Sequence, residues 1–200
     1  MGSGQKYRLK MKYDPDAHRP VFIMGYMACG KTTFGRALAR AAGKDFIDLD
    51  FRIEQRYHKS ISLIFADHGE PFFRDIETRM LREVAEMEDV VVACGGGTPC
   101  FNDNMKLMNR SGVTVWLEAS PGRIVERLTI NRSRRPLMAE KSPDELFEAV
   151  NAGLNSRQWY YRQAKIRFCG DQLEDRRQID DTVAKFLAAY PEISNTGSAD

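Results

Sequence analysis

The sequence predicts an α/β protein built as three layers, α/β/α, around a sheet of five parallel strands. Two observations predict this fold class. Five short apolar segments recur along the chain, with amphipathic or charged helical segments between them. A glycine-containing loop also joins the first apolar segment to a helix. Strands that alternate with helices are typical of a parallel sheet with both faces covered.

The expected strands are short apolar segments. They cover residues 21–24, 46–49, 90–93, 113–117 and 166–168. The helices expected between and after them cover residues 34–42, 51–58, 62–67, 71–87, 105–110, 121–128, 142–165 and 180–189. In sheets of this kind ligands bind at the carboxyl ends of the strands. Polar motifs that follow a strand are therefore the candidates for function.

The 200 residues, 42% of them hydrophobic, are enough for one well-filled core. We expect one domain over residues 21–190. Residues 1–20 are polar and start with Met-Gly-Ser-Gly, which is typical of a tag or an extension. Residues 191–200 are expected to form a disordered tail.

The loop after the first strand fits the phosphate-loop pattern of Gly, four residues, Gly, Lys and then Ser or Thr, from Gly25 to Thr32. In such loops the backbone N–H groups surround a phosphate, and a helix N-terminus faces the anion. Lys31 is expected to reach the phosphate oxygens, and the Thr32 hydroxyl to ligate Mg²⁺. The alternative is a turn with a chance Lys-Thr pair. Ala28 stands where many such loops have glycine, and a positive φ there would cost about 1 kcal/mol.

Two carboxylates, Asp48 and Asp50, alternate at the end of the second strand. Alternation can send one toward a metal ion and the other toward a substrate. The alternative is that the pair caps the helix that begins near Phe51. The third strand runs into Gly95, Gly96 and Gly97. Three glycines predict a close backbone approach to a small ligand, with a plain turn as the alternative.

Arginines supply the remaining candidates. Arg74 lies near the start of the helix over residues 71–87, where a salt-bridged surface role is the alternative. Residues 127–137 contain four arginines and end near a proline, which predicts a basic loop able to fold over phosphates. A solvated charged segment is the alternative. Arg157 lies beside aromatic residues, where desolvation strengthens a bidentate bond to a carboxylate.

The overall charge excludes some classes of partner. The 30 basic and 28 acidic residues give a net charge of +2, which favours neither nucleic acid nor a membrane surface. No apolar segment approaches the roughly 20 residues of a membrane span, and we expect a cytoplasmic protein. Four cysteines without metal-binding spacing are expected to be free thiols. Cys29, beside Lys31 and the loop amides, is expected to be the most reactive of them.

Together these motifs resemble the shikimate kinase family, over residues 21–187. The resemblance rests on the order and spacing of the phosphate loop, the Phe-Ile-Asp-Leu-Asp segment, the Gly-Glu-Pro-Phe-Phe-Arg segment, the three glycines, Arg135-Pro136-Leu137, and Arg157 followed by Tyr161. It implies a P-loop NTPase fold of the nucleoside-monophosphate-kinase type. A substrate-binding helical segment over about residues 51–82 and a lid over about residues 129–140 belong to that fold.

The resemblance implies transfer of the γ-phosphoryl group of ATP to the 3-hydroxyl of shikimate, with Mg²⁺ and a monomeric enzyme. It assigns ATP binding to Ala28, Cys29, Gly30, Lys31, Thr32, Thr33 and the lid residue Arg135. It assigns shikimate binding to Asp50, Arg74, Gly96 and Arg157, and the metal to Thr32 and, through water, Asp48. Lys31, Asp50 and Arg135 are the expected catalytic residues. The resemblance places Arg127 at the adenine. The family also contacts adenine in the region of residues 169–177, where no single residue is assigned.

Two other functions compete with this interpretation. Another small-molecule kinase on the same scaffold, such as a gluconate or nucleoside monophosphate kinase, would differ in its acceptor pocket. A nucleotide-binding module without catalysis is the other alternative, favoured by Ala28 and Cys29 in the loop. The arginine pair with the three glycines favours shikimate, and retention of Lys31 and Asp50 favours an enzyme.

Overall fold

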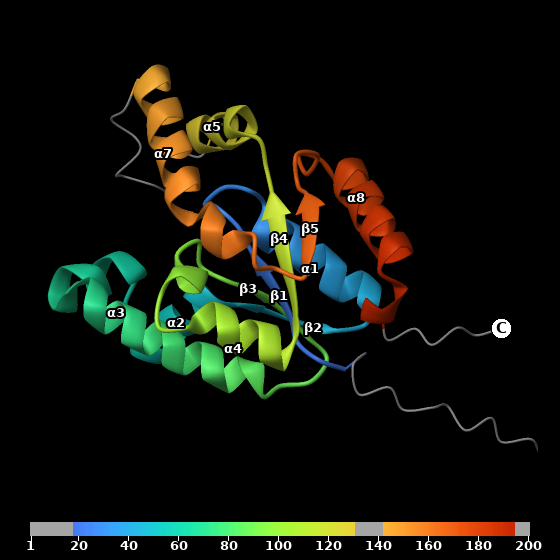
Figure 1. The fold of residues 1–200 in the computed structure, drawn as a ribbon, viewed down its shortest axis with the longest axis horizontal. Coiled ribbons are helices and arrows are strands. Elements are labelled where there is room, and N and C mark those ends of the chain that lie inside the picture. Colours follow the sequence, from blue (N-terminus) through green and yellow to red (C-terminus); the bar gives the residue numbers. More distant parts are fainter. Residues whose placement is uncertain (1–17, 131–141, 195–200) are drawn as a thin grey trace, which may run out of the picture.

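The computed structural model describes residues 18–130 and 142–194. Its centre is a sheet of five parallel strands in the order β2-β3-β1-β4-β5 (Figure 1). The strands are β1 (Val21–Met24), β2 (Asp45–Asp48), β3 (Val90–Ala93), β4 (Val113–Glu118) and β5 (Ile166–Cys169). The predicted fold class is confirmed, and each expected strand is present within one residue at either end.

Helices cover both faces of the sheet. The α-helices are α1 (Lys31–Ala42), α2 (Leu49–Tyr57), α3 (Ile61–Ala85), α4 (Asn104–Ser111), α5 (Pro121–Ile130), α7 (Pro143–Tyr161) and α8 (Arg176–Ala189). Helices α1 and α8 pack together on one face, and α3 and α4 pack together on the other (Figure 1). Within the described residues, none of the helices is long and apolar enough to cross a bilayer.

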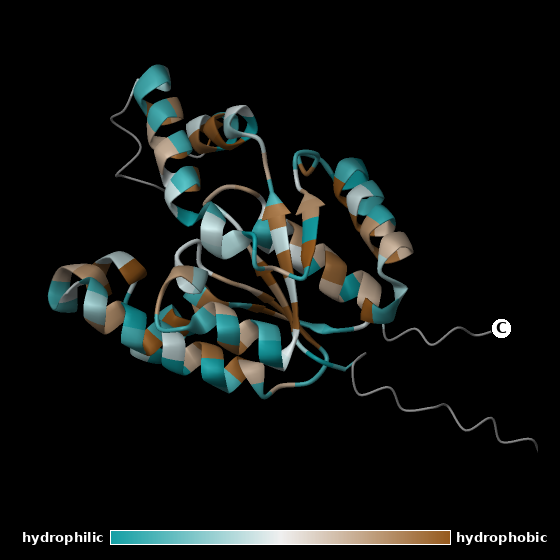
Figure 2. Ribbon diagram, viewed as in Figure 1, coloured by the Kyte–Doolittle hydropathy of each residue, from teal (hydrophilic) through white to brown (hydrophobic). Residues whose placement is uncertain are grey.

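The core explains why these strands are apolar. Every residue of β1 and β3 is buried, as a sheet covered on both faces requires. Figure 2 shows the hydrophobic colour concentrated in the strands and on the inner sides of the helices. On the α1 side, Phe34, Phe168 and Phe186 join α1, β5 and α8, with ring centroids 5.0–5.9 Å apart. This core fixes the carboxyl ends of the strands, where the polar motifs lie.

Helix α3 differs from the two helices expected over residues 62–67 and 71–87. In the structure both lie within α3. Gly69 has φ 78° and ψ 174°, so the helical backbone is interrupted there. Pro71 lacks the N–H that a continuous helix would need, and its ring disfavours helical backbone in the residue before it. The expected break is therefore present, as a kink at Gly69 inside α3.

Both predicted ends of the domain need correction. Residues 18–20 were assigned to the extension, but the His18 carbonyl accepts a hydrogen bond from the Asp89 N–H and the Pro20 carbonyl accepts one from the Val113 N–H. Residues 191–193 were assigned to the disordered tail, but they form a 3₁₀ turn in which Ile193 is buried. Short polar segments with one anchoring contact are easily mistaken for tails.

Candidate active site

One cavity of about 850 Å³ opens at the carboxyl ends of β1, β2 and β3. It is lined by residues from the phosphate loop, from α2 and α3, from the three-glycine segment and from α7. Seven predicted site residues line it: Lys31, Thr32, Asp48, Asp50, Arg74, Gly96 and Arg157. These residues are up to 126 positions apart in the chain, from Lys31 to Arg157. The fold therefore brings the separate motifs to one place.

The phosphate loop has the strained backbone that its pattern predicts. Gly25, Ala28 and Gly30 all have positive φ, at 149°, 61° and 104°. The left-handed conformation of Ala28 costs about 1 kcal/mol more than it would for glycine. The ammonium of Lys31 donates to the carbonyls of Gly25 and Tyr26, both at 3.0 Å. These two bonds hold the positive charge of Lys31 over the loop, where an anion would bind.

Asp48 caps a helix and also faces the cavity, so it fits both the capping role and the metal-binding role that the sequence left open. One carboxylate oxygen accepts a hydrogen bond from the Phe51 N–H at 3.3 Å and caps α2. The other accepts the Thr32 hydroxyl at 2.8 Å. A hydroxyl and a carboxylate side by side, both on the cavity wall, form an oxygen donor set of the kind that Mg²⁺ prefers.

Asp50 is the carboxylate with the most altered acidity on the cavity wall. Its pKa is raised from 3.8 to about 6, first by burial and then by the charges of Glu77 and Asp48, while Lys31 lowers it. A carboxylate with this pKa is ionised at neutral pH and still basic enough to accept a proton from a substrate.

Arg74 is held from both sides on α3. Its guanidinium bonds to Glu77 at 2.9 Å and to Glu70 at 2.8 Å, and it lies 4.1 Å from the centre of the Phe101 ring. Glu77 is fully buried and also accepts the Thr98 hydroxyl at 2.5 Å. The side chain of Arg74 is 14% exposed. The salt-bridged alternative is thus correct in part, because the same arginine also lines the cavity.

Two of the three glycines, Gly95 and Gly97, are explained by what surrounds them. A Cβ on Gly95 would lie within 3.0 Å of side-chain oxygens of Glu77, Asp50 and Thr98. One on Gly97 would lie 2.8 Å from the Arg74 guanidinium, and one on Gly96 would lie 3.5 Å from that of Arg157. The predicted close approach to a small ligand stays a prediction. In the structure the tight neighbours of Gly95 and Gly97 are side chains of the site itself, whereas a Cβ on Gly96 would make ordinary contacts.

Arg157 reaches the cavity from α7. Its guanidinium lies 5.2 Å from the centre of the Tyr26 ring, which places it over the start of the phosphate loop. Tyr161, one helical turn later, donates its hydroxyl to the Gly96 carbonyl at 2.6 Å. Burial raises the pKa of Tyr161, so the hydroxyl stays protonated. This bond fixes α7 against the three-glycine segment.

Comparison with known proteins agrees with this geometry. The sequence model of the family described as Shikimate kinase matches residues 27–188. The chain belongs to the shikimate kinase family. A shikimate kinase from Phocaeicola vulgatus is 49% identical over 163 residues, which cover 82% of this chain and 93% of that protein.

Two solved structures of shikimate kinases have the same fold. The crystal structure from Bacteroides thetaiotaomicron is 44% identical, covers 86% of this chain and 98% of its own, and has a TM-score of 0.84. A shikimate kinase from Acinetobacter baumannii, solved in complex with shikimate, is 28% identical, covers 88% of this chain and 94% of its own, and has a TM-score of 0.76.

Other predicted site residues of this shikimate kinase either do not line the large cavity or fall outside the described residues. Ala28, Cys29, Gly30 and Thr33 belong to the phosphate loop and the start of α1 but do not line the large cavity. Arg135 and residues 131–140 of the expected lid fall outside the described residues. Residues 129 and 130, also assigned to the lid, form the end of α5.

Sequence reasoning missed Glu77, which is buried on the cavity wall and bonds to both Arg74 and Thr98. Its position was available as a signal, since residues three apart on a helix face the same side and Glu77 follows Arg74 by three. The burial of Glu77 could not be predicted from the sequence, because a glutamate at this spacing usually lies in solvent.

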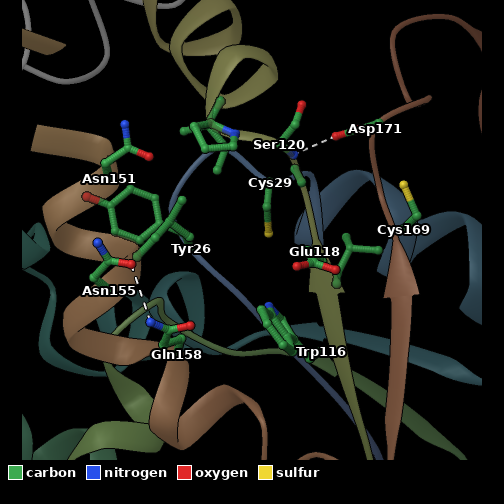
Figure 3. A pocket seen from close by; sticks show the side chains of 15 residues that line it. Tyr26, Cys29, Trp116, Glu118, Ser120, Asn151, Asn155, Gln158, Cys169 and Asp171 are labelled. Atoms are coloured by element: carbon green, nitrogen blue, oxygen red, sulfur yellow. Dashed lines mark hydrogen bonds between the residues drawn. The ribbon is translucent and has the colours of Figure 1, made fainter. Parts of the chain in front are cut away.

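A second cavity, of about 360 Å³, lies on the other side of the phosphate loop, between β4, α5 and α7 (Figure 3). Tyr26 and Cys29 form its wall toward the loop, and Asn151, Asn155 and Gln158 project into it from α7. Within the described residues its lining has no lysine, arginine or histidine. Among the described residues it therefore offers no cationic side chain to a phosphate, in contrast to the large cavity.

The expected reactivity of Cys29 needs correction. Cys29 is 1% exposed, whereas Cys169 is exposed. A thiol must be accessible to react, whatever charge surrounds it. We therefore predict that iodoacetamide modifies Cys169 before Cys29, as mapped by peptide mass spectrometry of the folded protein. Faster modification of Cys29, with protection by nucleotide, would restore the expectation from sequence.

Proposed function

We propose that this protein transfers the γ-phosphoryl group of ATP to the 3-hydroxyl of shikimate, giving shikimate 3-phosphate and ADP. One observation carries the proposal. Asp50, with its raised pKa, shares one cavity with the phosphate-loop lysine and with two arginines. A cavity with a base, a phosphate-binding end and two guanidinium groups fits a hydroxylated carboxylic acid beside a polyphosphate.

In this proposal Asp50 accepts the proton of the attacking hydroxyl, and Arg74 and Arg157 bind the shikimate carboxylate near the Gly96 backbone. Lys31 neutralises charge on the transferred phosphoryl group. Phosphoryl transfer needs little covalent help from the protein, so positioning and charge neutralisation supply most of the rate. Phe65 and Phe73 on α3 line the same cavity and provide an apolar wall for a ring.

Mg²⁺ is part of the proposal, and the donors present fit it. Thr32 and Asp48 supply a hydroxyl and a carboxylate that already lie 2.8 Å apart. Mg²⁺ retains several waters and takes few protein ligands beside the phosphates of its substrate. When bound, it would neutralise phosphate charge. Within the described residues there is no cluster of three or more acids, histidines or cysteines that could replace this site.

The remaining parts of the proposal rest on sequence. Arg135 is proposed to reach the γ-phosphate from the lid, and the backbone of residues 28–33 to surround the ATP phosphates. We propose a monomer as the active unit, as the family resemblance implies. We propose the cytoplasm as its location, because ATP is the co-substrate and all four cysteines are free.

The first test is an acceptor panel in a coupled ADP-release assay. We expect shikimate to support turnover, with gluconate and nucleoside monophosphates giving at most about 10⁻² of its kcat/KM. Nucleoside monophosphates lack a carboxylate for the arginine pair, and the open chain of gluconate lacks a ring to pack on Phe65 and Phe73. Higher turnover with another acceptor would show that this acceptor, and not shikimate, is the substrate. Binding of ATP with no turnover of any acceptor would favour the nucleotide-binding module.

A second prediction concerns Arg157→Ala. We expect KM for shikimate to rise about 10²-fold with little change in KM for ATP, because a bidentate bond from a partly buried guanidinium to a carboxylate is lost. Arg162→Ala is the matched control, since Arg162 is exposed and caps the same helix. Equal effects of the two substitutions on KM for shikimate would contradict the assignment.

A further inference from the structure

Arg127, on α5, is outside the large cavity and yet is buried. Its side chain is 10% exposed. Its guanidinium donates to the carbonyls of Ala28 at 3.4 Å and Cys29 at 3.0 Å, and to those of Gly170 at 2.9 Å and Asp171 at 3.1 Å. The fifth N–H donates to Glu174 at 2.8 Å. One side chain therefore joins the phosphate loop to the segment after β5.

The contact with the loop falls at its strained part. Ala28 has φ 61° and Gly30 has φ 104°, so the peptide groups around Cys29 are held between two left-handed residues. Alanine leaves this conformation readily unless other contacts hold it. In a trans peptide the C=O and the next N–H point in opposite directions. With the Cys29 carbonyl on Arg127, the Gly30 N–H points away from Arg127.

The other side of the contact is firmly anchored. The Gly170 N–H donates to the Glu118 carbonyl at 2.6 Å. Asp171 accepts the Ser120 N–H at 2.8 Å with its side chain, at the start of α5 (Figure 3). Leu173 packs so closely on Gly30 that a Cβ there would lie 2.5 Å from its Cδ1. Residues 170–174 therefore give Arg127 a fixed base from which to hold the loop.

We propose that Arg127 is a positioning residue that holds the phosphate loop in its anion-binding shape. It acts on the phosphates of the nucleotide through the loop backbone. This is distinct from a contact with the adenine, which the family resemblance assigns to the same arginine. The proposal depends on phosphate binding by the loop and does not depend on the identity of the acceptor.

A probe without adenine separates the two roles. Binding of magnesium tripolyphosphate and of MgADP is measured by calorimetry. For Arg127→Ala we expect both dissociation constants to rise about tenfold or more, because bonds from a charged donor to two loop carbonyls are lost. KM for shikimate is expected to stay within about twofold. Arg123→Ala, one turn earlier on α5, is the control and should leave both probes unchanged. Arg123 bonds to Glu126 at 2.6 Å and lies 3.9 Å from Glu174, at the limit of an ion pair.

Weaker binding of MgADP with unchanged binding of tripolyphosphate would overturn the proposal, because it would show a direct contact with the nucleoside. Since tripolyphosphate binding needs no acceptor, the result stands even if shikimate proves not to be the substrate.

A second variant tests whether the arginine acts through the strained loop. Glycine adopts positive φ without strain, so in an Ala28→Gly protein the loop needs less support. We expect Arg127→Ala to weaken tripolyphosphate binding by a smaller factor in that background than in the wild type. Equal factors would overturn the proposal. Arg127→Lys serves if the alanine variant does not fold, since lysine keeps the charge but cannot span both segments.

Discussion

Replacing Asp50 by asparagine is expected to lower kcat about 10³-fold while making the protein more stable at neutral pH. The loss of rate follows because asparagine cannot accept the proton of the acceptor hydroxyl. The gain in stability follows because burial and the nearby charges of Glu77 and Asp48 oppose the ionised form of Asp50. A shift in pKa from 3.8 to about 6 corresponds to about 3 kcal/mol at neutral pH.

The pH dependence follows from the same shift. The folded protein binds the Asp50 proton more tightly than the unfolded chain does, so this group lowers the free energy of unfolding as pH rises from about 4 to about 6. The Asp50→Asn substitution removes this fall in the free energy of unfolding. The variant should therefore be more stable than the wild type above pH 6 and similar to it near pH 4. The wild-type kcat should fall below pH 6, as the base becomes protonated.

Urea unfolding at pH 7.5 and pH 4, together with kcat from pH 5 to 8, checks these expectations. Asp75→Asn is the matched control, because Asp75 is exposed on α3 and should change neither stability nor rate. An Asp50→Asn protein with wild-type kcat would remove Asp50 from catalysis. One that is less stable than the wild type at pH 7.5 would show that the carboxylate is stabilised where it lies.

The second large effect is expected from Glu77. Glu77→Ala leaves Arg74 and the Thr98 hydroxyl without their buried acceptor. Breaking a buried charged pair by removing one partner costs about 3 kcal/mol or more. We expect that loss in the free energy of unfolding. We also expect KM for shikimate to rise about 10²-fold, because Arg74 then keeps only its exposed partner Glu70 and its guanidinium is less firmly oriented.

Glu77→Gln separates charge from packing. The neutral side chain fills the same space but no longer raises the pKa of Asp50, so the acid limb of kcat should move to lower pH. Glu70→Gln is the control: it alters the other carboxylate on Arg74, which is 52% exposed, and should leave the acid limb in place. An unchanged acid limb in Glu77→Gln would show that this charge does not tune Asp50.

The strands and the phosphate loop could be predicted because their signals are local. An apolar run such as Val21–Met24 is buried wherever a covered sheet forms, and the spacing of Lys31 after Gly25 is set by the loop itself. Helix ends were less accurate. Helix α8 begins at Arg176, four residues before the expected start. The Asp175 side chain caps it by accepting the Gln178 N–H, and this bond depends on the turn after β5.

The chain order of residues determined the fold class, the phosphate loop and the set of arginines and acids from which the site is built. Only the tertiary structure decided the burial of Glu77, the pKa of Asp50 and the attachment of Arg127 to the phosphate loop. The physical reason is range. Backbone preference and hydrophobic periodicity act over a few neighbouring residues, whereas desolvation and charge coupling depend on groups that lie far apart in sequence and meet only when the sheet assembles.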